Sequence, residues 1–388
     1  MLVDSPRIAE LAERPGDLAA FWAEVERRGT PLLEPADDGS RVVTFVWRGT
    51  PGTTDVLLLA NRLTDRDNLA ASRMRRLPGT DLWHLSYLLP DDYRGTYQIA
   101  PDFSGQHDAD NAHWQRLMAT ARTDPFNPDT VDTGRNGLAS SVVELPAAPE
   151  QPWWRPAGAP AGRVSEHRLT STILGNSRSI WLYEPREASE GTLVLFDGNV
   201  WFPRLSFQHT LDNLIAAGAI PPVSAIGVDT IDVPTRRREL GGNPDFVTFL
   251  TAELLPWAGQ RLGASPAADR TVVAGQSFGG LTALLAGHLA PDRFGNVLCQ
   301  SPSLWRAQHL IDAYPAGRDI RLHLSVGRYE RDMVDHTRAL RDHLAHQGYP
   351  VSLTEYTGGH DFVCWRGCLA DGLIELTGAR DHLSHVDG

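Results

Sequence analysis

Two different patterns of hydrophobic and polar residues divide the chain near residue 150. Between Arg41 and about Ala100, short apolar runs alternate with polar residues and are separated by turns rich in Gly, Pro and Asp. Alternation with a period of two is typical of strands that bury one face, so this part predicts an antiparallel β-sandwich. Residues 1–29 place apolar side chains at helical spacing and predict two short amphipathic helices, and residues 111–121 also have a helical pattern.

After residue 165, strongly apolar runs alternate with helical segments. The helical patterns cover residues 209–219, 246–262, 280–290 and 336–348. Such alternation predicts a mostly parallel sheet with helices on both faces. We therefore expect a helical segment and an Ig-like β-sandwich domain over 1–145, a linker rich in Pro, Ala and Gly over 146–164, and an α/β-hydrolase-type domain over 165–388.

Charge and composition argue against several classes of protein. The chain has 48 acidic and 36 basic residues, which gives a formal charge of −12, and it contains no Lys. This balance argues against nucleic acid or an anionic membrane as a general partner. No apolar run reaches the ~18 residues of a membrane helix, no secretory signal pattern is seen, and three cysteines are too few for a disulfide framework. We therefore expect a cytoplasmic protein.

The strongest chemical signal is a G-x-S-x-G motif, Gly275-Gln276-Ser277-Phe278-Gly279. It follows the predicted strand Thr271–Ala274 and opens the predicted helix Gly280–Leu289. This is the context of a nucleophile elbow, in which a strained turn exposes the serine hydroxyl at a helix N-terminus. Ser277 is therefore the candidate nucleophile, and the backbone N–H of Phe278 is a candidate oxyanion donor.

A serine nucleophile needs a base, and in such folds the base is a histidine in a loop after the last strand. His360 fits this position because a strand and two glycines precede it. The other candidate histidines lie within a predicted strand or on helical segments: His288, His323, His336, His343 and His346.

The third member of a triad is expected in the loop after the apolar strand at residues 320–327. Glu330 is the nearest carboxylate after that strand, and Asp332 and Asp335 follow it. Any of the three has the reach to orient an imidazole, so the residues alone leave the acid open.

The strand at residues 192–196 ends before Gly198 and Asn199, which by position are candidates for the second oxyanion donor. Trp201 and Trp305 are placed to line a substrate cleft. Arg236 and Arg366 are candidates to bind an anionic or aromatic substrate, because a guanidinium pairs with oxyanions and stacks on rings. A packed or solvated role is the alternative for each of these side chains.

These motifs resemble the enterochelin (enterobactin) esterases over nearly the whole chain. The resemblance includes VTFVWRG, GTDLWHLSYLL and ARTDPFNPDT in the first half, and LFDGNVW, IDVPTRRREL, DRTVVAGQSFGGLTAL and GGHDFVCWRG in the second. It implies that Ser277 is the nucleophile, that His360 is the base and that Glu330 is the acid. It also matches Arg236 and Glu239 to an Arg-x-x-Glu-Leu stretch, with Arg236 facing the substrate.

The function implied by this resemblance is a serine esterase that opens the trilactone backbone of a catecholate siderophore and so releases iron. No resident metal or cofactor is expected, because iron arrives bound to the substrate. The alternative is a related carboxylesterase or acyltransferase acting on aromatic or sugar esters. A siderophore-binding protein without catalysis is disfavoured by the presence of both Ser277 and His360.

Overall fold

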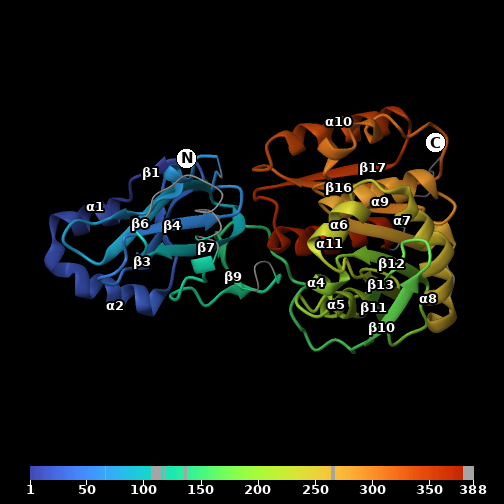
Figure 1. Ribbon diagram of the computed structural model, residues 1–388, viewed down its shortest axis with the longest axis horizontal. Helices are drawn as coiled ribbons and strands as arrows, with labels where there is room; N and C mark the ends of the chain where they lie inside the picture. The colour runs from blue at the N-terminus through green and yellow to red at the C-terminus, as the bar shows by residue number, and fades with distance from the viewer. Residues whose placement is uncertain (66, 106–115, 117–118, 135–137, 264–266, 379–388) are drawn as a thin grey trace, which may run out of the picture. The chain divides into compact units, whose positions relative to one another are not determined.

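The computed structural model describes residues 1–65, 67–105, 116, 119–134, 138–263 and 267–378, and the chain divides into two compact units (Figure 1). Unit 1 comprises Met1–Pro149 and Thr357–Cys364, and unit 2 comprises Glu150–Tyr356 and Trp365–Gly388. The helix expected over residues 111–121 falls largely outside the described residues. Among the described residues, no helix combines the length and apolar character that a membrane crossing requires.

Unit 1 contains two antiparallel sheets, as the alternating pattern predicts. One sheet has the order β1-β6-β3-β2 with β5 on β6, and the other has the order β4-β7-β9-β8. The strands of the first sheet are β1 (Leu2–Val3), β2 (Leu32–Pro35), β3 (Ser40–Arg48), β5 (Arg75–Arg76) and β6 (Leu82–Pro90). Those of the second are β4 (Asp55–Ala60), β7 (Arg94–Asp102), β8 (Thr130–Val131) and β9 (Ser140–Glu144).

The two sheets share an aromatic core. The ring of Phe45 on β3 lies 4.7 Å from the ring of Tyr97 on β7 and 6.4 Å from that of Tyr87 on β6. The expected N-terminal helices are α1 (Pro6–Glu13) and α2 (Leu18–Arg28), and their apolar faces pack on the first sheet. The predicted β-sandwich is thus confirmed.

Unit 2 is built on one sheet with the strand order β10-β11-β13-β12-β14-β15-β16-β17. The pairs β10–β11 and β11–β13 are antiparallel and the other neighbouring pairs are parallel, so the sheet is mostly parallel as predicted. The strands are β10 (Arg163–Ser171), β11 (Asn176–Glu184), β12 (Gly191–Phe196), β13 (Val223–Val228), β14 (Thr271–Gln276), β15 (Asn296–Gln300), β16 (Arg321–Gly327) and β17 (Val351–Tyr356). The helices are α4 (Gly198–Trp201), α5 (Gln208–Ala216), α6 (Val233–Glu239), α7 (Pro244–Phe249), α8 (Leu255–Leu262), α9 (Phe278–Leu289), α10 (Asp332–His346) and α11 (Phe362–Thr377), of which Phe362–Cys364 belong to unit 1.

Two successive residues of β15 show that helices cover both faces of this sheet. A Cβ atom on Gly287 of α9 would lie 2.5 Å from Cγ2 of Val297, whereas one on Gly372 of α11 would lie 2.8 Å from Cδ1 of Leu298. Because successive side chains of a strand point to opposite faces, α9 and α11 lie on opposite sides of β15. The α/β-hydrolase-type architecture is confirmed.

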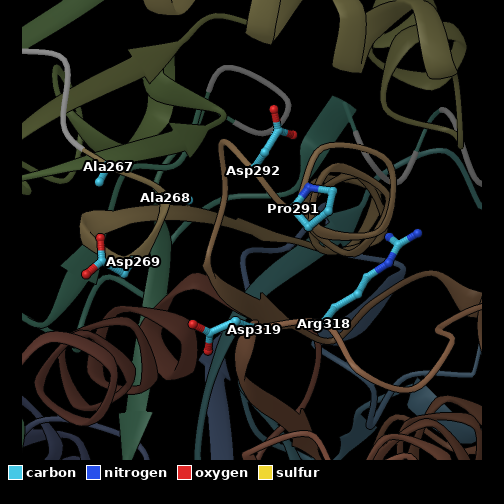
Figure 2. Close-up of a pocket in the computed structure, with 7 residues that line it drawn as sticks. All are labelled: Ala267, Ala268, Asp269, Pro291, Asp292, Arg318 and Asp319. Carbon is cyan, nitrogen blue, oxygen red and sulfur yellow. The ribbon is translucent and has the colours of Figure 1, made fainter.

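A pocket of about 470 Å³ lies at the amino-terminal edge of this sheet (Figure 2). The residues that line it precede β14, β15 and β16: Ala267, Ala268, Asp269, Pro291, Asp292, Arg318 and Asp319. Ser277 and Glu330 instead follow the carboxyl ends of β14 and β16. Parallel α/β sheets hold ligands at the carboxyl edge, so this pocket is separate from the candidate active site.

Candidate active site

Ser277 occupies a strained turn between β14 and α9. Its backbone has φ 61° and ψ −119°, a conformation that is rare outside glycine. The turn is also crowded, because a Cβ atom on Gly275 would lie 2.5 Å from the carbonyl carbon of Gly279. The Ser277 side chain is partly exposed, and its Oγ lies 3.4 Å from Oγ of Ser303. The local structure is that of the predicted nucleophile elbow.

The candidate oxyanion donors come from two neighbouring loops. Phe278 is the first residue of α9, where the backbone N–H groups have no partner within the helix. Gly198 and Asn199 begin the short helix α4, and a Cβ atom on Gly198 would lie 2.4 Å from the carbonyl carbon of Gly227, so only glycine fits there. A Cβ atom on Gly279 would lie 3.6 Å from Oδ2 of Asp197, which places the α4 loop beside the elbow. The structure therefore places the segment that carries Gly198 and Asn199 next to the start of α9, where Phe278 lies.

A buried polar network joins these two loops. Arg236 donates from Nε to Oδ1 of Asp197 at 2.6 Å and from Nη2 to Oδ2 at 2.8 Å. Gln276, the residue before the nucleophile, donates from Nε2 to Oδ2 of Asp197 at 2.6 Å. Burial acts to lower the pKa of Arg236, but the charge of Asp197 and its hydrogen bonds raise that pKa above its ordinary value. Arg236 is thus held by Asp197, but its side chain remains 22% exposed, so a contact between Arg236 and the substrate stays a prediction.

Trp201 belongs to the same network and not to an open cleft. Its side chain is 0% exposed, and its Nε1 lies 3.2 Å from Oε1 of Gln276. The prediction that Trp201 lines the substrate cleft is therefore wrong. The indole packs 5.6 Å from the ring of Phe207, and its N–H donates to the buried amide oxygen of Gln276.

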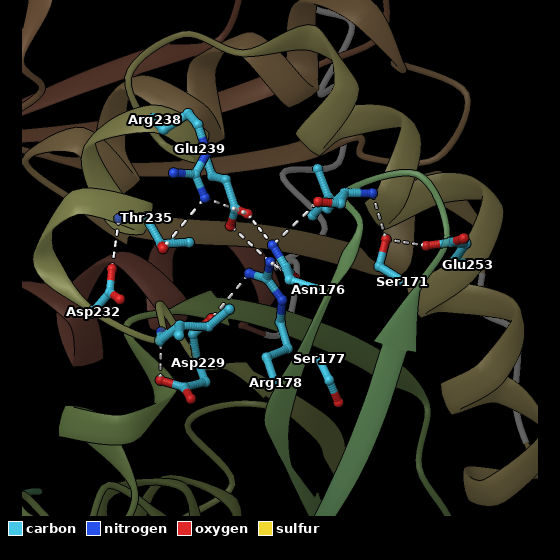
Figure 3. A network of polar contacts seen from close by, with 12 residues as sticks. Ser171, Asn176, Ser177, Arg178, Asp229, Asp232, Thr235, Arg238, Glu239 and Glu253 are labelled. Carbon is cyan, nitrogen blue, oxygen red and sulfur yellow. Dashed lines mark hydrogen bonds and ion pairs between the residues drawn. The ribbon is translucent and has the colours of Figure 1, made fainter.

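The helix that carries Arg236 is itself fastened to the sheet by a buried ion pair (Figure 3). Glu239 of α6 accepts from Nη2 of Arg178 at 2.7 Å and from Nδ2 of Asn176 at 2.6 Å, and both charged side chains are at most 3% exposed. The Arg178 guanidinium also lies 5.0 Å from the ring centroid of Phe249. Removing one partner of such a pair leaves an uncompensated buried charge and costs about 3–5 kcal/mol, so this contact holds α6 in one place.

Glu330 is the buried carboxylate among the three candidate acids. Its side chain accepts at Oε1 from Oγ of Ser301 at 2.6 Å, from the backbone N–H of Gly327 at 2.9 Å and from the hydroxyl of Tyr356 at 3.1 Å. Asp332 and Asp335 are exposed residues in the first turn of α10. The structure therefore favours Glu330 over both aspartates as the acid.

His360 lies in the loop that follows β17, and this loop belongs to unit 1. The amide of Asn61 donates to the backbone oxygen of His360 at 2.8 Å. The next residue, Asp361, accepts from the backbone N–H of Thr96 at 2.8 Å and from its hydroxyl at 2.5 Å. Asn61 and Thr96 of the β-sandwich thus fix the loop that carries the His360 side chain. Ser277 and Glu330 belong to unit 2.

The remaining predicted binding residues separate into one exposed and one buried side chain. Trp305 is 53% exposed, and its ring lies 5.9 Å from that of Phe278, next to the nucleophile. Arg366 is only 7% exposed. It donates from Nε to Oε1 of Gln151 at 2.7 Å and stacks 3.7 Å over the ring of Trp154. The prediction that Arg366 faces the substrate is therefore wrong, because this guanidinium packs on the linker.

Sequence reasoning missed several residues of the site, namely Asn61, Asp197, Gln276, Ser301, Ser303 and Tyr356. Two of them carried a usable signal: Asp197 and Gln276 are polar residues at the ends of apolar strands, immediately beside predicted donors. Ser301 directly follows the apolar strand β15, but its left-handed backbone, with φ 44°, is visible only in the structure. Asn61 carried none, because its partner lies 299 positions away.

Comparison with known proteins covers both units. A family model described as "Enterochelin esterase, N-terminal" matches residues 42–154, and one described as "Putative esterase" matches residues 171–376. The iron(III) salmochelin esterase of Escherichia coli O6:H1 (strain CFT073) is 34% identical over 93% of this chain and 94% of its own length.

Solved structures agree with the sequence relatives. The ferric enterobactin esterase of Salmonella typhimurium is 31% identical and superimposes with a TM-score of 0.81, covering 92% of this chain and 98% of its own. The enterobactin esterase of Shigella flexneri, crystallised in the presence of enterobactin, is 32% identical with a TM-score of 0.79, covering 91% of this chain and 97% of its own.

Proposed function

Because this chain belongs to the enterochelin esterase family, an ester-hydrolase family, we propose that it opens the trilactone backbone of a catecholate siderophore, enterobactin or its ferric complex. The observation that carries the proposal is a complete nucleophile elbow beside an oxyanion loop, in a chain that is similar to such esterases through both of its units. The products would be the linear trimer and dimer and the monomer of dihydroxybenzoylserine.

The proposed chemistry is acyl transfer to serine followed by hydrolysis. Ser277 Oγ attacks a lactone carbonyl while His360 accepts the hydroxyl proton, and the backbone N–H groups of Phe278 and of Gly198 or Asn199 stabilise the oxyanion. His360 then protonates the leaving serine hydroxyl, and water cleaves the acyl-enzyme by the same steps. Glu330 serves as the acid that orients the imidazole.

The substrate supplies the iron in this proposal, so the enzyme needs no metal of its own. Ferric tris-catecholate is an anion, and the net charge of −12 opposes its approach at long range. Salt screens such repulsion beyond ~10 Å, so local contacts decide binding. The exposed ring of Trp305, next to the partly buried ring of Phe278, suits the aromatic arms of the substrate.

A cytoplasmic location is part of the proposal. All three cysteines, Cys299, Cys364 and Cys368, are buried and unpaired with one another, as is usual for proteins in a reducing compartment. A catecholate siderophore would then be opened after its import into the cell.

Chromatography of digests tests the proposed function directly. Purified protein is incubated with enterobactin, with and without iron, and the products are separated by reversed-phase chromatography. We expect the linear trimer, dimer and monomer of dihydroxybenzoylserine. An intact trilactone, together with hydrolysis of feruloyl or acetyl sugar esters, would instead support the carboxylesterase alternative.

The substitution Glu330→Gln tests the assignment of the acid. Glutamine has the same shape and keeps an acceptor for Ser301, Gly327 and Tyr356, but it lacks the charge that stabilises an imidazolium. We expect kcat to fall by about 10²-fold. The matched control is Asp335→Asn, which changes an exposed carboxylate of the next helix and should leave kcat within about twofold. The reverse pattern would move the acid from Glu330 to Asp335.

Trp305→Ala tests whether the exposed ring contacts an aromatic arm. Aromatic stacking contributes about 0.5–1.5 kcal/mol, so we expect KM for enterobactin to rise roughly threefold to tenfold with little change in kcat. KM for para-nitrophenyl acetate should stay constant, because this small ester does not extend to the ring. Leu289→Ala, which changes an exposed apolar side chain at the far end of α9, is the control. Equal changes in KM for both esters would exclude a specific role for Trp305.

A further inference from the structure

We propose that Asp197 is a positioning residue. Paired with Arg236 and bonded to Gln276, it fixes the α4 segment with Gly198 and Asn199 relative to the elbow with Phe278, so that donors from both segments can form one oxyanion hole. This inference rests on the assignment of Ser277 and its oxyanion donors within the proposed function. It does not depend on which ester the enzyme prefers.

Asp197 stands at the point where β12 becomes α4. Its φ of 57° is left-handed, a conformation that aspartate tolerates better than most residues. Its backbone oxygen accepts from the N–H groups of Val200 at 2.8 Å and Trp201 at 3.2 Å, so Asp197 caps the helix that begins at Gly198. Its side chain is 4% exposed, so the carboxylate is part of the interior and not of the substrate surface.

A carboxylate this deeply buried must be matched by donors. Both of its oxygens are used: Oδ1 accepts from Nε of Arg236, and Oδ2 accepts from Nη2 of Arg236 and Nε2 of Gln276. The two bonds from Arg236 form a planar fork, the geometry that holds a carboxylate most tightly and in one orientation. The Asp197 carboxylate is therefore a fixed point beside the elbow.

Gln276 connects the Asp197 carboxylate to the nucleophile, because it is the residue before Ser277. Its side-chain amide is bound at both ends, by Asp197 at Nε2 and by Trp201 at Oε1. Asp197 and Trp201 are the two residues that bracket the turn of α4 containing Gly198 and Asn199. Gln276, the residue before Ser277, is thus hydrogen-bonded to both ends of the segment that contains the candidate donors Gly198 and Asn199.

Arg236 can play this part because its own helix is immobilised. Glu239 lies three positions further along α6 and pairs with Arg178 of β11 inside the protein (Figure 3). The Arg-x-x-Glu spacing therefore lets Glu239 pair with Arg178 of the sheet while Arg236 pairs with Asp197 beside the candidate oxyanion donors. Nη2 of Arg236 also approaches the backbone oxygen of Gln276, at 3.4 Å.

This arrangement should affect the transition state more than substrate binding. Oxyanion donors act on charge that develops during attack, and removing one donor lowers kcat by about 10²–10³-fold. Releasing Asp197 displaces donors without removing them, so we expect a smaller loss of kcat at an unchanged KM.

The test is a double-mutant cycle with Asp197→Asn, Arg236→Gln and the double variant, assayed on the small neutral ester para-nitrophenyl acetate. We expect each single variant to lower kcat by about 10–100-fold with KM within about twofold, and the double variant to be no worse than the poorer single one. Arg236→Lys keeps the charge but not the fork, so it should recover part of the loss. Asp212→Asn is the matched control: this buried carboxylate accepts from Tyr183 and Gly162 in the same unit, and its loss should lower the melting temperature with kcat within about threefold.

Three results would overturn the inference. One is Asp197→Asn with the kcat of the wild type. Another is a fully additive double variant, which would show that the two side chains act separately. The third is that Arg236→Gln or Arg236→Lys raises KM for ferric enterobactin but changes neither kcat nor KM for para-nitrophenyl acetate. That result would make Arg236 a substrate ligand. Hydrolysis of the siderophore by the wild type is measured in a separate experiment. Failure of the proposed function would therefore be distinguished from failure of the proposed role of Asp197.

Discussion

Ser277→Ala is expected to lower kcat for siderophore hydrolysis by about 10³-fold or more. The strained turn places this hydroxyl at the N-terminus of α9, in the segment that also contains the candidate donor Phe278. Alanine removes the attacking oxygen and leaves the donors in place, so a small residual rate supported by them should remain. The measurement is the single-turnover rate of trilactone opening, followed by chromatography, together with mass spectrometry of the protein. The wild type should carry a transient acyl group that the variant lacks.

Ser303→Ala is the matched control, because this second serine lies 3.4 Å from Ser277 Oγ. Ser303 takes no part in the proposed attack or proton transfer, and losing one hydrogen bond costs about 0.5–1.5 kcal/mol, so its loss should change the rate by less than about tenfold. A loss below about 10²-fold in Ser277→Ala, or acylation of a different residue, would show that Ser277 is not the nucleophile.

His360→Ala should be nearly as damaging as loss of the nucleophile, with kcat reduced by about 10³-fold. Without a base the Ser277 hydroxyl must lose its proton to water, and the leaving serine of the substrate has no acid. Because alanine vacates the volume of one imidazole, added imidazole should restore part of the rate at concentrations that leave the wild type unaffected. The assay is hydrolysis of enterobactin and para-nitrophenyl acetate across a series of imidazole concentrations.

His346→Ala provides the comparison, because this exposed histidine lies at the end of α10. Its removal should leave kcat within about twofold. Full activity in His360→Ala would instead mean that another residue accepts the proton, and it would withdraw His360 from the proposed mechanism.

Several hydrogen bonds fix the segments that carry the candidate catalytic residues. In unit 2, Asp197, Arg236 and Gln276 neutralise and orient one another next to the nucleophile. In unit 1, Asn61 and Thr96 hold the backbone around His360. In the proposed mechanism these residues position reacting groups without touching the substrate, whereas Ser277 and His360 take part in the reaction itself.

The sequence alone predicted most of the strands and helices of the fold, although not β10 or α11, and it predicted a strand–turn–helix context for Ser277, whose role as the nucleophile stays a prediction. Strand and helix periods depend on residues a few positions apart, and the elbow is encoded by five consecutive residues, Gly275 to Gly279, between a strand and a helix. The candidate base followed from a similar local context at His360. Local patterns survive folding because the backbone conformations they favour are used unchanged.

Tertiary structure decided what each remaining side chain does. Trp201 and Arg366 look like binding residues in the sequence, but one fills the core and the other stacks on Trp154. Arg236 meets a carboxylate 39 positions earlier, and the loop of His360 meets an amide 299 positions earlier. A guanidinium or an indole can pair with many groups, and only the folded chain determines which of them lies within hydrogen-bonding distance.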